Sequence, residues 1–249
     1  VISSYKLREV NIYGAVMNPG KYIINEGSGI KDLILLAGGY TKNAYPLGGV
    51  LENQKTKEIN QLASTKLYET FLDNLANLST KGSDEGFESI VSIMTQLKDK
   101  PTSGRVSANF DLDLINSGEV KDIVLQNGDE VTIPEYLDHV YIFGEVSSEG
   151  TIRFSENKDI SYYIDKSGGY SNFADKKGIF ILQPNGETQR YKRANIFNAR
   201  EKIKIYPGSV IFIPKEINNS LLVRETAQAY ATILGNIGVS LASVSVLKD

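Results

Sequence analysis

The chain contains an internal repeat, and this repeat constrains its fold more than any other feature of the sequence. Residues 10–45 align without a gap to residues 140–175 at a constant offset of 130, and 12 of the 36 aligned positions are identical. A fixed offset between two matching segments is the mark of a duplicated structural unit. We therefore expect the chain to contain the same small module twice.

The first half of each copy predicts two strands followed by a helix. The pattern Val-x-Ile-x-Gly-x-Val, which starts at Val10 and again at Val140, alternates with a period of two and predicts a strand with one buried face. A turn that ends at Gly20 or Gly150 leads into a second short strand. Apolar residues then take helical spacing, and a pair of glycines follows the helix, where a left-handed residue is favoured.

The second half of each copy repeats at a smaller offset of 80. Residues 123–134 and 203–214 both contain a turn with glycine and then an apolar strand that ends in proline. The offset is smaller because the first copy has additional residues, mainly between Thr56 and Arg105. Two apolar stripes at helical spacing predict a helical hairpin there, which either covers the sheet or contacts a partner. The stripes are Leu67, Phe71, Leu75 and Leu78, then Phe87, Ile90, Met94 and Leu97.

These patterns predict an α+β fold built from two tandem domains, each with one helix on a mixed sheet. The first domain is expected at residues 8–136, with the helical insertion at about 57–104. The second is expected at 137–217, and residues 218–249 are expected to form a C-terminal amphipathic helix. With 41% hydrophobic residues, the chain is able to bury a core in each domain.

The C-terminal segment is free of charge from residue 226 to residue 247, a run of 22 residues. As a helix it would be about 33 Å long, close to the roughly 30 Å hydrocarbon core of a bilayer. One face would be an apolar stripe, the candidate membrane helix surface, made of Tyr230, Ile233, Ile237, Leu241 and Val244. The opposite face would carry the polar residues Gln228, Asn236 and Ser243, as a candidate lumen or neighbour face.

A helix with these two faces suits a ring of identical copies better than a lone span. Each copy would turn its apolar face to lipid and its polar face to a neighbour or to a watery lumen. The competing interpretation is an ordinary amphipathic helix that docks on its own domain. The absence of charge over six turns weakens that interpretation, because a helix on a soluble surface normally carries Lys and Glu outside.

Composition and motif spacing argue against an enzyme. The chain has no cysteine and one histidine, His139, so a thiolate metal site is excluded, and a triad or His-based zinc site would depend on that residue. Asp111 and Asp113 alternate with apolar residues, which places both carboxylates outward on one face of a predicted strand. Asp129 is best explained as a turn residue bonded to its own backbone. We expect no catalytic residues, no cofactor and no metal.

Two other sequence features bear on partners. The net charge is −3 and the pI about 5.4, which argues against nucleic acid as a partner. Tyr40 and Tyr170, each placed after a Gly-Gly pair, could stack on sugar rings or, alternatively, pack over the helix end. The first residues carry no signal-peptide pattern, so Val1 is expected to be an internal cut in a longer protein.

Three blocks of the repeat resemble the soluble-ligand-binding β-grasp (SLBB) domain: Ile12–Gly20, Ala37–Tyr40 and Gly128–Pro134. Two such domains followed by an amphipathic helix resemble the outer-membrane polysaccharide export proteins of the Wza type. The resemblance covers about residues 8–217 by motif and 218–249 by position and character. DNA-uptake proteins and a respiratory-complex subunit carry single copies of the domain, so the motif is more specific for the domain than for the export family.

The resemblance implies a non-enzymatic export channel for a capsular polysaccharide or exopolysaccharide. Copies would form a homo-oligomeric ring in the periplasm, with C-terminal helices as a pore in the outer membrane of a Gram-negative-type bacterium. The partners would be the polysaccharide in transit and an inner-membrane polysaccharide co-polymerase. The chain departs from the family pattern because it lacks the N-terminal export domain and the lipidated cysteine, and because it contains the inserted hairpin.

A second hypothesis fits the same modules. A soluble periplasmic SLBB binding module would capture a glycan or small ligand, with the last helix docked on its own body. A third, DNA uptake, uses the module resemblance alone, and the chain lacks the basic surface that DNA binding requires.

Overall fold

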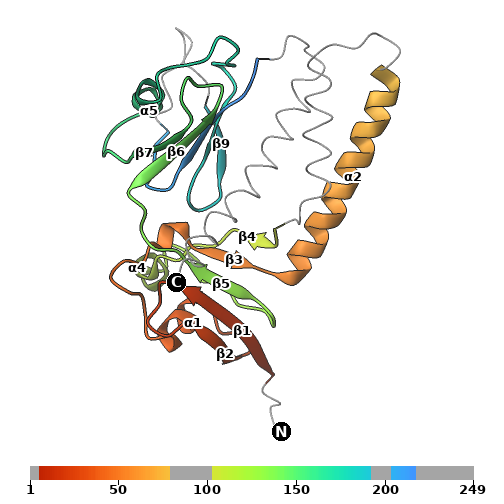
Figure 1. The fold of residues 1–249 in the computed structure, drawn as a ribbon. Coiled ribbons are helices and arrows are strands. Elements are labelled where there is room, and N and C mark those ends of the chain that lie inside the picture. The colour runs from red at the N-terminus through yellow and green to blue at the C-terminus, as the bar shows by residue number, and fades with distance from the viewer. Residues whose placement is uncertain (1–5, 79–102, 192–202, 217–249) are drawn as a thin grey trace. The chain divides into compact units, whose positions relative to one another are not determined.

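A computed structural model describes residues 6–78, 103–191 and 203–216 of the chain (Figure 1). The chain divides into two compact units, and the division between the two repeat copies falls after Tyr136. Each unit contains one five-stranded sheet of mixed strand direction. The α+β class and the duplication expected from the sequence are confirmed in this part of the chain.

The sheet of the first unit is built around two parallel central strands. Its strands span Leu7–Gly14 (β1), Gly20–Asn25 (β2), Val50–Glu52 (β3), Arg105–Val106 (β4) and Glu130–Ile133 (β5). Their order across the sheet is β2-β1-β5-β3-β4. The central strands β1 and β5 are parallel, and all other neighbours are antiparallel.

The second sheet repeats this arrangement strand for strand. Its strands span His139–Gly144 (β6), Gly150–Arg153 (β7), Ile179–Leu182 (β8), Thr188–Tyr191 (β9) and Val210–Ile213 (β10). The order is β7-β6-β10-β8-β9, again with a parallel pair, β6 and β10, at the centre. Strand β6 corresponds to β1 at the offset of 130, and β10 corresponds to β5 at the offset of 80, as the sequence repeat predicts.

One short helix packs on one face of each sheet. Helix α1 spans Ile30–Leu36 and helix α5 spans Ile160–Lys166, beside β1 and β2 and beside β6 and β7 respectively (Figure 1). The alternate residues of the strands that face the helix form the core. Together with apolar residues of the helix, they make up a core that includes Val10, Ile12, Leu33, Ile34, Val131 and Ile133 in the first unit, and Val140, Ile142, Tyr163, Ile164, Ile211 and Ile213 in the second. Each buried aliphatic side chain contributes roughly 1.5–3 kcal/mol to the free energy of folding, so each core stabilises its own unit.

The glycines after each helix have a structural role in both units. Gly38 and Gly168 both have φ +84°, the left-handed conformation that ends a helix and that favours glycine. The turn between the first two strands then packs against this helix end. Met17 N donates to Gly39 O at 3.0 Å, and Ser147 N donates to Gly169 O at 3.0 Å. A Cβ at Gly38 would lie 3.0 Å from the Met17 Cβ, so the close approach also favours glycine.

The insertion in the first copy begins with a long helix, α2, at Gln54–Leu78. Asn53 caps it, because its Oδ1 accepts a hydrogen bond from Thr56 N at 3.1 Å. The Asn60 side chain donates to Ser103 O at 2.7 Å and ties the start of α2 to the returning chain. The first apolar stripe of the predicted hairpin falls within α2. The second stripe, residues 87–97, lies outside the described residues.

The segment around Asp111 is helical, and here the strand prediction is wrong. Helix α4 spans Leu112–Ser117 and follows β4 in the chain. A short 3-10 turn, η1, lies much earlier, at Pro46–Gly48. The Asp111 Oδ1 accepts hydrogen bonds from Asp113 N at 3.0 Å and Leu114 N at 3.2 Å, and Gly118 ends the helix at φ 78°. The two carboxylates therefore do not share a strand face. A helix cap and a C-terminal glycine outweigh an alternation of only five residues.

Candidate functional site

The two tyrosines singled out in the sequence lie against the cores of their units. The Tyr40 hydroxyl donates to Phe110 O at 2.5 Å, and burial raises the pKa of this phenol well above its usual range. The Tyr170 ring packs on the second core, and Lys176 Nζ lies 5.3 Å from its centroid. Both rings thus pack on the cores of their units, while packing over the helix end and stacking on a sugar stay predictions.

An exposed aromatic residue that sequence reasoning missed lies three positions after Tyr170. The Phe173 side chain is 63% exposed, and Lys215 Nζ lies 5.4 Å from its ring centroid. Residues 170–177 form a loop after α5 that also carries Lys176 and Lys177, both exposed. Aligning the two copies gives the signal that finds Phe173, because Asn43 stands at the corresponding position of the first unit.

The outer face of the second sheet, opposite α5, is aromatic and apolar. Phe143, Phe212 and Phe180 lie in register across β6, β10 and β8, and the Phe143 and Phe212 ring centroids are 4.9 Å apart. The neighbouring register row contains Tyr141, Val210 and Leu182. Val210 and Leu182 are each 1% exposed. Burial raises the pKa of the Tyr141 phenol, as expected for a ring within an apolar surface.

The outer face of the first sheet is polar at the same positions. Where the second sheet has the row of Tyr141, Val210 and Leu182, the first sheet has Asn11, Glu130 and Glu52. Where the second sheet has Phe212 and Phe180, the first has Thr132 and Val50. The two helix-facing cores are alike, so the copies have the same fold with different outer surfaces. The outer face of the second sheet thus adds buried apolar side chains, among them Phe180, Leu182 and Val210, that do not belong to the helix-facing core.

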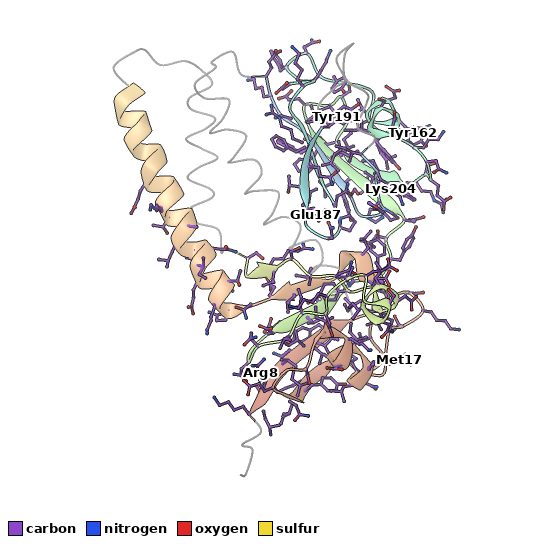
Figure 2. All side chains as sticks on the ribbon, turned by 180° about the vertical axis from the view of Figure 1, so that it is seen from behind. Arg8, Met17, Tyr162, Glu187, Tyr191 and Lys204 are labelled. Carbon is purple, nitrogen blue, oxygen red and sulfur yellow. The ribbon has the colours of Figure 1, made fainter. Side chains whose placement is uncertain are left out.

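The first unit has its own exposed apolar patch, which we call the helix-end patch: Met17, Leu35 and Leu36. These side chains are 61%, 57% and 56% exposed, at the β1–β2 turn and the C-terminal end of α1; Met17 is labelled in Figure 2. In the second unit the corresponding residues are Ser147, Asp165 and Lys166. The fold itself therefore tolerates polar residues at these positions, and their apolar character in the first unit indicates an interaction surface.

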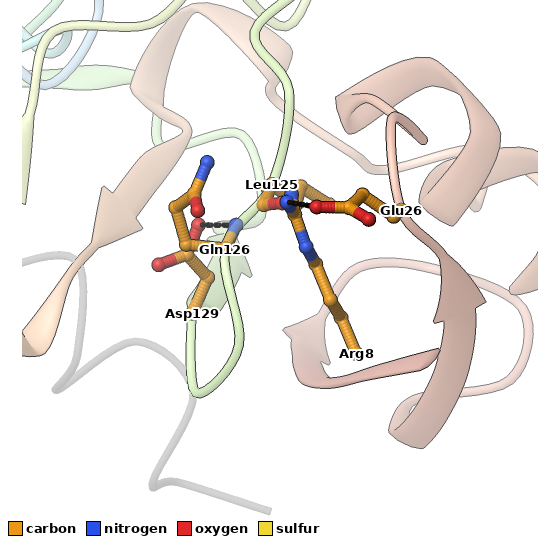
Figure 3. A network of polar contacts seen from close by, with 5 residues as sticks. All are labelled: Arg8, Glu26, Leu125, Gln126 and Asp129. Atoms are coloured by element: carbon orange, nitrogen blue, oxygen red, sulfur yellow. Dashed lines mark hydrogen bonds and ion pairs between the residues drawn. The ribbon is translucent and has the colours of Figure 1, made fainter. Parts of the chain in front are cut away.

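Polar contacts brace the turn before the last strand in both units. Asp129 is 2% exposed; its Oδ2 accepts from Gln126 N at 2.7 Å and its Oδ1 from Asn53 Nδ2 at 2.6 Å. This confirms Asp129 as a turn residue. Close by, the Arg8 guanidinium donates to Leu125 O and forms an ion pair with Glu26 at 3.1 Å (Figure 3).

The second unit uses neutral groups for the same brace. There, Tyr206 N donates to Ser209 Oγ at 3.0 Å, and that hydroxyl donates to Gln183 Oε1 at 2.8 Å. Because one pair of side chains replaces the other in the same geometry, the brace is a structural feature of the module. It gives no reason to assign a catalytic role to Asp129.

The single histidine is also satisfied locally. His139 Nε2 lies 2.6 Å from the Tyr141 hydroxyl, and the two rings meet edge to face with centroids 4.7 Å apart. The side chain belongs to a strand within the sheet rather than to a cluster of acids and bases. Within residues 6–78, 103–191 and 203–216, His, Asp and Glu side chains form no group of three that could hold a metal ion.

The residues predicted to form the membrane helix and its polar face lie outside the described residues, since residues 217–249 are not among them. In the part of the chain that the structure covers, no helix combines the length and hydropathy of a membrane span. The exposed features in the described residues are the loop around Phe173 and the helix-end patch.

Comparison with known proteins identifies relatives of both copies. Residues 21–130 match the family model described as capsule biosynthesis GfcC, N-terminal, and residues 148–237 match the model described as capsule biosynthesis GfcC C-terminal. The Escherichia coli K12 protein YjbG is 25% identical over 158 residues, which cover 64% of this chain and 63% of YjbG.

A polysaccharide transport protein is a second kind of relative. The Escherichia coli polysialic acid transport protein KpsD is 24% identical over 127 residues, which cover 51% of this chain and 21% of KpsD. The chain thus spans less than two thirds of the length of either relative.

Proposed function

The chain belongs to the GfcC family of capsule biosynthesis proteins, and on that premise we propose that it is a non-enzymatic component of capsular polysaccharide export. The observation that carries this proposal is the match of 127 residues to KpsD, whose name describes polysialic acid transport. The described residues fit such a role, because their distinctive features are an exposed aromatic loop and an exposed apolar patch.

In this proposal the two units are SLBB-type modules of a Wza-like assembly. Copies of the chain associate into a ring in the periplasm, with the helix-end patch as a contact between copies. The charge-free segment 226–247 inserts in the outer membrane, with the stripe of Tyr230, Ile237 and Val244 toward lipid. An inner-membrane polysaccharide co-polymerase supplies the polymer and the driving force, and the chain needs no cofactor.

A specific observation favours a second candidate, the soluble binding module with its tail docked on its own body. Val210 and Leu182 lie on the outer face of the second sheet and are each 1% exposed, and an apolar helix stripe is the kind of segment that such a face buries. The tail begins directly after β10, which contributes Val210 to that face. In this arrangement the protein would hold a glycan without forming a pore.

The export role is tested by removing the gene from a capsulated bacterium that carries it and measuring polymer in separated fractions. We expect total polymer to persist while surface polymer falls and polymer accumulates inside the cell, and the wild-type gene to restore the surface fraction. Unchanged surface polymer would contradict the proposal. Loss of all polymer with accumulation of its sugar precursors would instead indicate a biosynthetic enzyme.

A further inference from the structure

The loop after α5 carries two aromatic rings and two lysines, and a third lysine, Lys215, lies beside it after β10 in the second unit. We call these residues together the loop surface: Tyr170, Phe173, Lys176, Lys177 and Lys215. Each ring has an ammonium group close to it, at 5.3 Å for Lys176 on Tyr170 and 5.4 Å for Lys215 on Phe173. Phe173 is 63% exposed although a lysine lies beside it, so much of its ring is open to solvent.

The backbone holds this surface in a defined shape. Phe173 O accepts a hydrogen bond from Glu216 N at 2.7 Å, which holds the backbone at Phe173 beside the end of β10 and Lys215. Asp175 N donates to Pro214 O at 2.8 Å, and the Asp175 carboxylate accepts from Lys177 N at 2.9 Å. A loop backbone held in this way loses little conformational entropy when a ligand binds to it.

The acidic residues near the loop are engaged within it. The Glu145 Oε2 accepts a hydrogen bond from the Ser171 hydroxyl at 2.5 Å, and the Asp175 carboxylate caps the amides of Lys177 and Gly178. Glu216 is exposed next to Lys215. The ammonium groups of Lys176 and Lys215 therefore lie near the rings. Two of the three carboxylates, those of Glu145 and Asp175, form hydrogen bonds with groups of the loop.

The first unit builds the same loop without these side chains. Tyr136 N donates to Asn43 O at 2.8 Å and Tyr45 N to Pro134 O at 2.8 Å, the same two bonds as in the second unit. Yet the side chains differ. The second unit has Phe173, Lys176, Lys177 and Lys215, and the corresponding residues of the first unit are Asn43, Pro46, Leu47 and Glu135, in that order. The fold thus needs neither the exposed ring nor the lysines, so folding alone does not explain the exposed aromatic ring.

The chemistry of the loop surface fits one class of ligand. An exposed aromatic face packs on the apolar face of a sugar ring, and an ammonium group beside it pairs with a carboxylate on that sugar. We propose that the loop surface binds an acidic polysaccharide through Phe173 and Lys215, with Tyr170 and Lys176 at its margin. This inference rests on the proposed export function and specifies the polymer as one with carboxylate-bearing sugars.

The test is titration calorimetry of the full chain with two acidic polymers, polygalacturonate and polysialic acid, and with neutral dextran. We expect at least one acidic polymer to bind, dextran not to bind, and added salt to weaken binding. Phe173→Ala and Lys215→Ala should each weaken binding about fivefold to tenfold, through the lost stacking or charge contact. Both residues are on the surface, so circular dichroism and the thermal midpoint should stay unchanged.

A matched control uses another lysine–aromatic pair of the same unit. Lys158 Nζ lies 5.4 Å from the ring of Tyr162, which is on α5 and is labelled in Figure 2. Lys158→Ala should leave binding unchanged. The inference is overturned if neither acidic polymer binds, if dextran binds equally well, or if the two loop variants bind like wild type.

The experiments can disprove the loop inference and the export role independently of one another. If acidic polymers do not bind and gene removal still leaves polymer inside the cell, the loop inference is wrong and the export role stands. If the loop variants lose binding while gene removal leaves surface polymer unchanged, the site is real and the export role is wrong.

Discussion

At the scale of single residues, Tyr40 shows how a tyrosine after a Gly-Gly pair contributes to the core of its unit. Its hydroxyl donates to Phe110 O, and its ring packs on the first core. Sequence alone leaves both uses open, because a tyrosine after Gly-Gly has the same spacing whether it faces a sugar or a core. The structure adds the partner of the hydroxyl, Phe110 O, which lies 70 residues further along the chain.

Tyr40→Phe is expected to make the stability of the chain less sensitive to alkaline pH. Removing the hydroxyl leaves Phe110 O without this donor and should cost about 1 kcal/mol at pH 8. Burial raises the folded-state pKa of Tyr40, so the folded chain holds the phenolic proton more tightly than the unfolded chain. The contribution is complete below the usual value of 10.0 and is lost as the pH rises above it.

Urea unfolding of wild type and Tyr40→Phe at pH 8 and pH 10.5 measures this difference. The gap between the two proteins should narrow at the higher pH. Tyr136→Phe, at a side chain that is 49% exposed, is the control for general effects of alkali. A gap that stays constant or widens would show that the Tyr40 hydroxyl is not the group that titrates.

At the scale of elements, helix α4 depends on its cap more than on its apolar pattern. No residue of α4 is fully buried, so the helix gains little from packing. Its N-terminal amides instead bond to the Asp111 carboxylate. A charge at this end also interacts favourably with the helix dipole.

Asp111→Ala should therefore destabilise the first unit by about 1 kcal/mol, the usual effect of removing an N-cap. Asp113→Ala serves as the matched control. It removes an equal charge two residues later, from a side chain that does not cap the helix, and should cost a few tenths of a kcal/mol. Thermal unfolding by circular dichroism gives both values. Equal losses in the two variants would mean that charge, rather than the cap, holds the helix.

The elements that periodicity and glycines specify could be predicted from the sequence, and those that depend on caps could not. Strands β1 and β6 and helices α1 and α5 follow from alternation, helical spacing and the paired glycines. The segment at α4 was misassigned because five alternating residues fit a strand, while Asp111 and Gly118 specify a helix. Phe173 was missed because one exposed aromatic residue has no periodic pattern, and only alignment of the copies distinguishes it from Asn43.

At the scale of the whole molecule, duplication has preserved the inside of each unit and changed the outside. The helix-facing cores correspond position by position, while the helix-end patch belongs to the first unit and the aromatic outer face to the second. A chain with two similar bodies and different surfaces is suited to making two different contacts. In the export proposal, one of these contacts is with the next copy of the chain.

The measurement that tests this assembly most directly is the mass of the intact chain in detergent by light scattering. We predict a ring whose mass is a multiple of 27.4 kDa. Converting Leu35 and Leu36 to Asp and Lys, the residues of the second copy, should release monomers that remain folded, and deletion of residues 217–249 should abolish membrane association. An intact chain of 27.4 kDa in detergent, whose membrane association does not change on that deletion, would contradict the account.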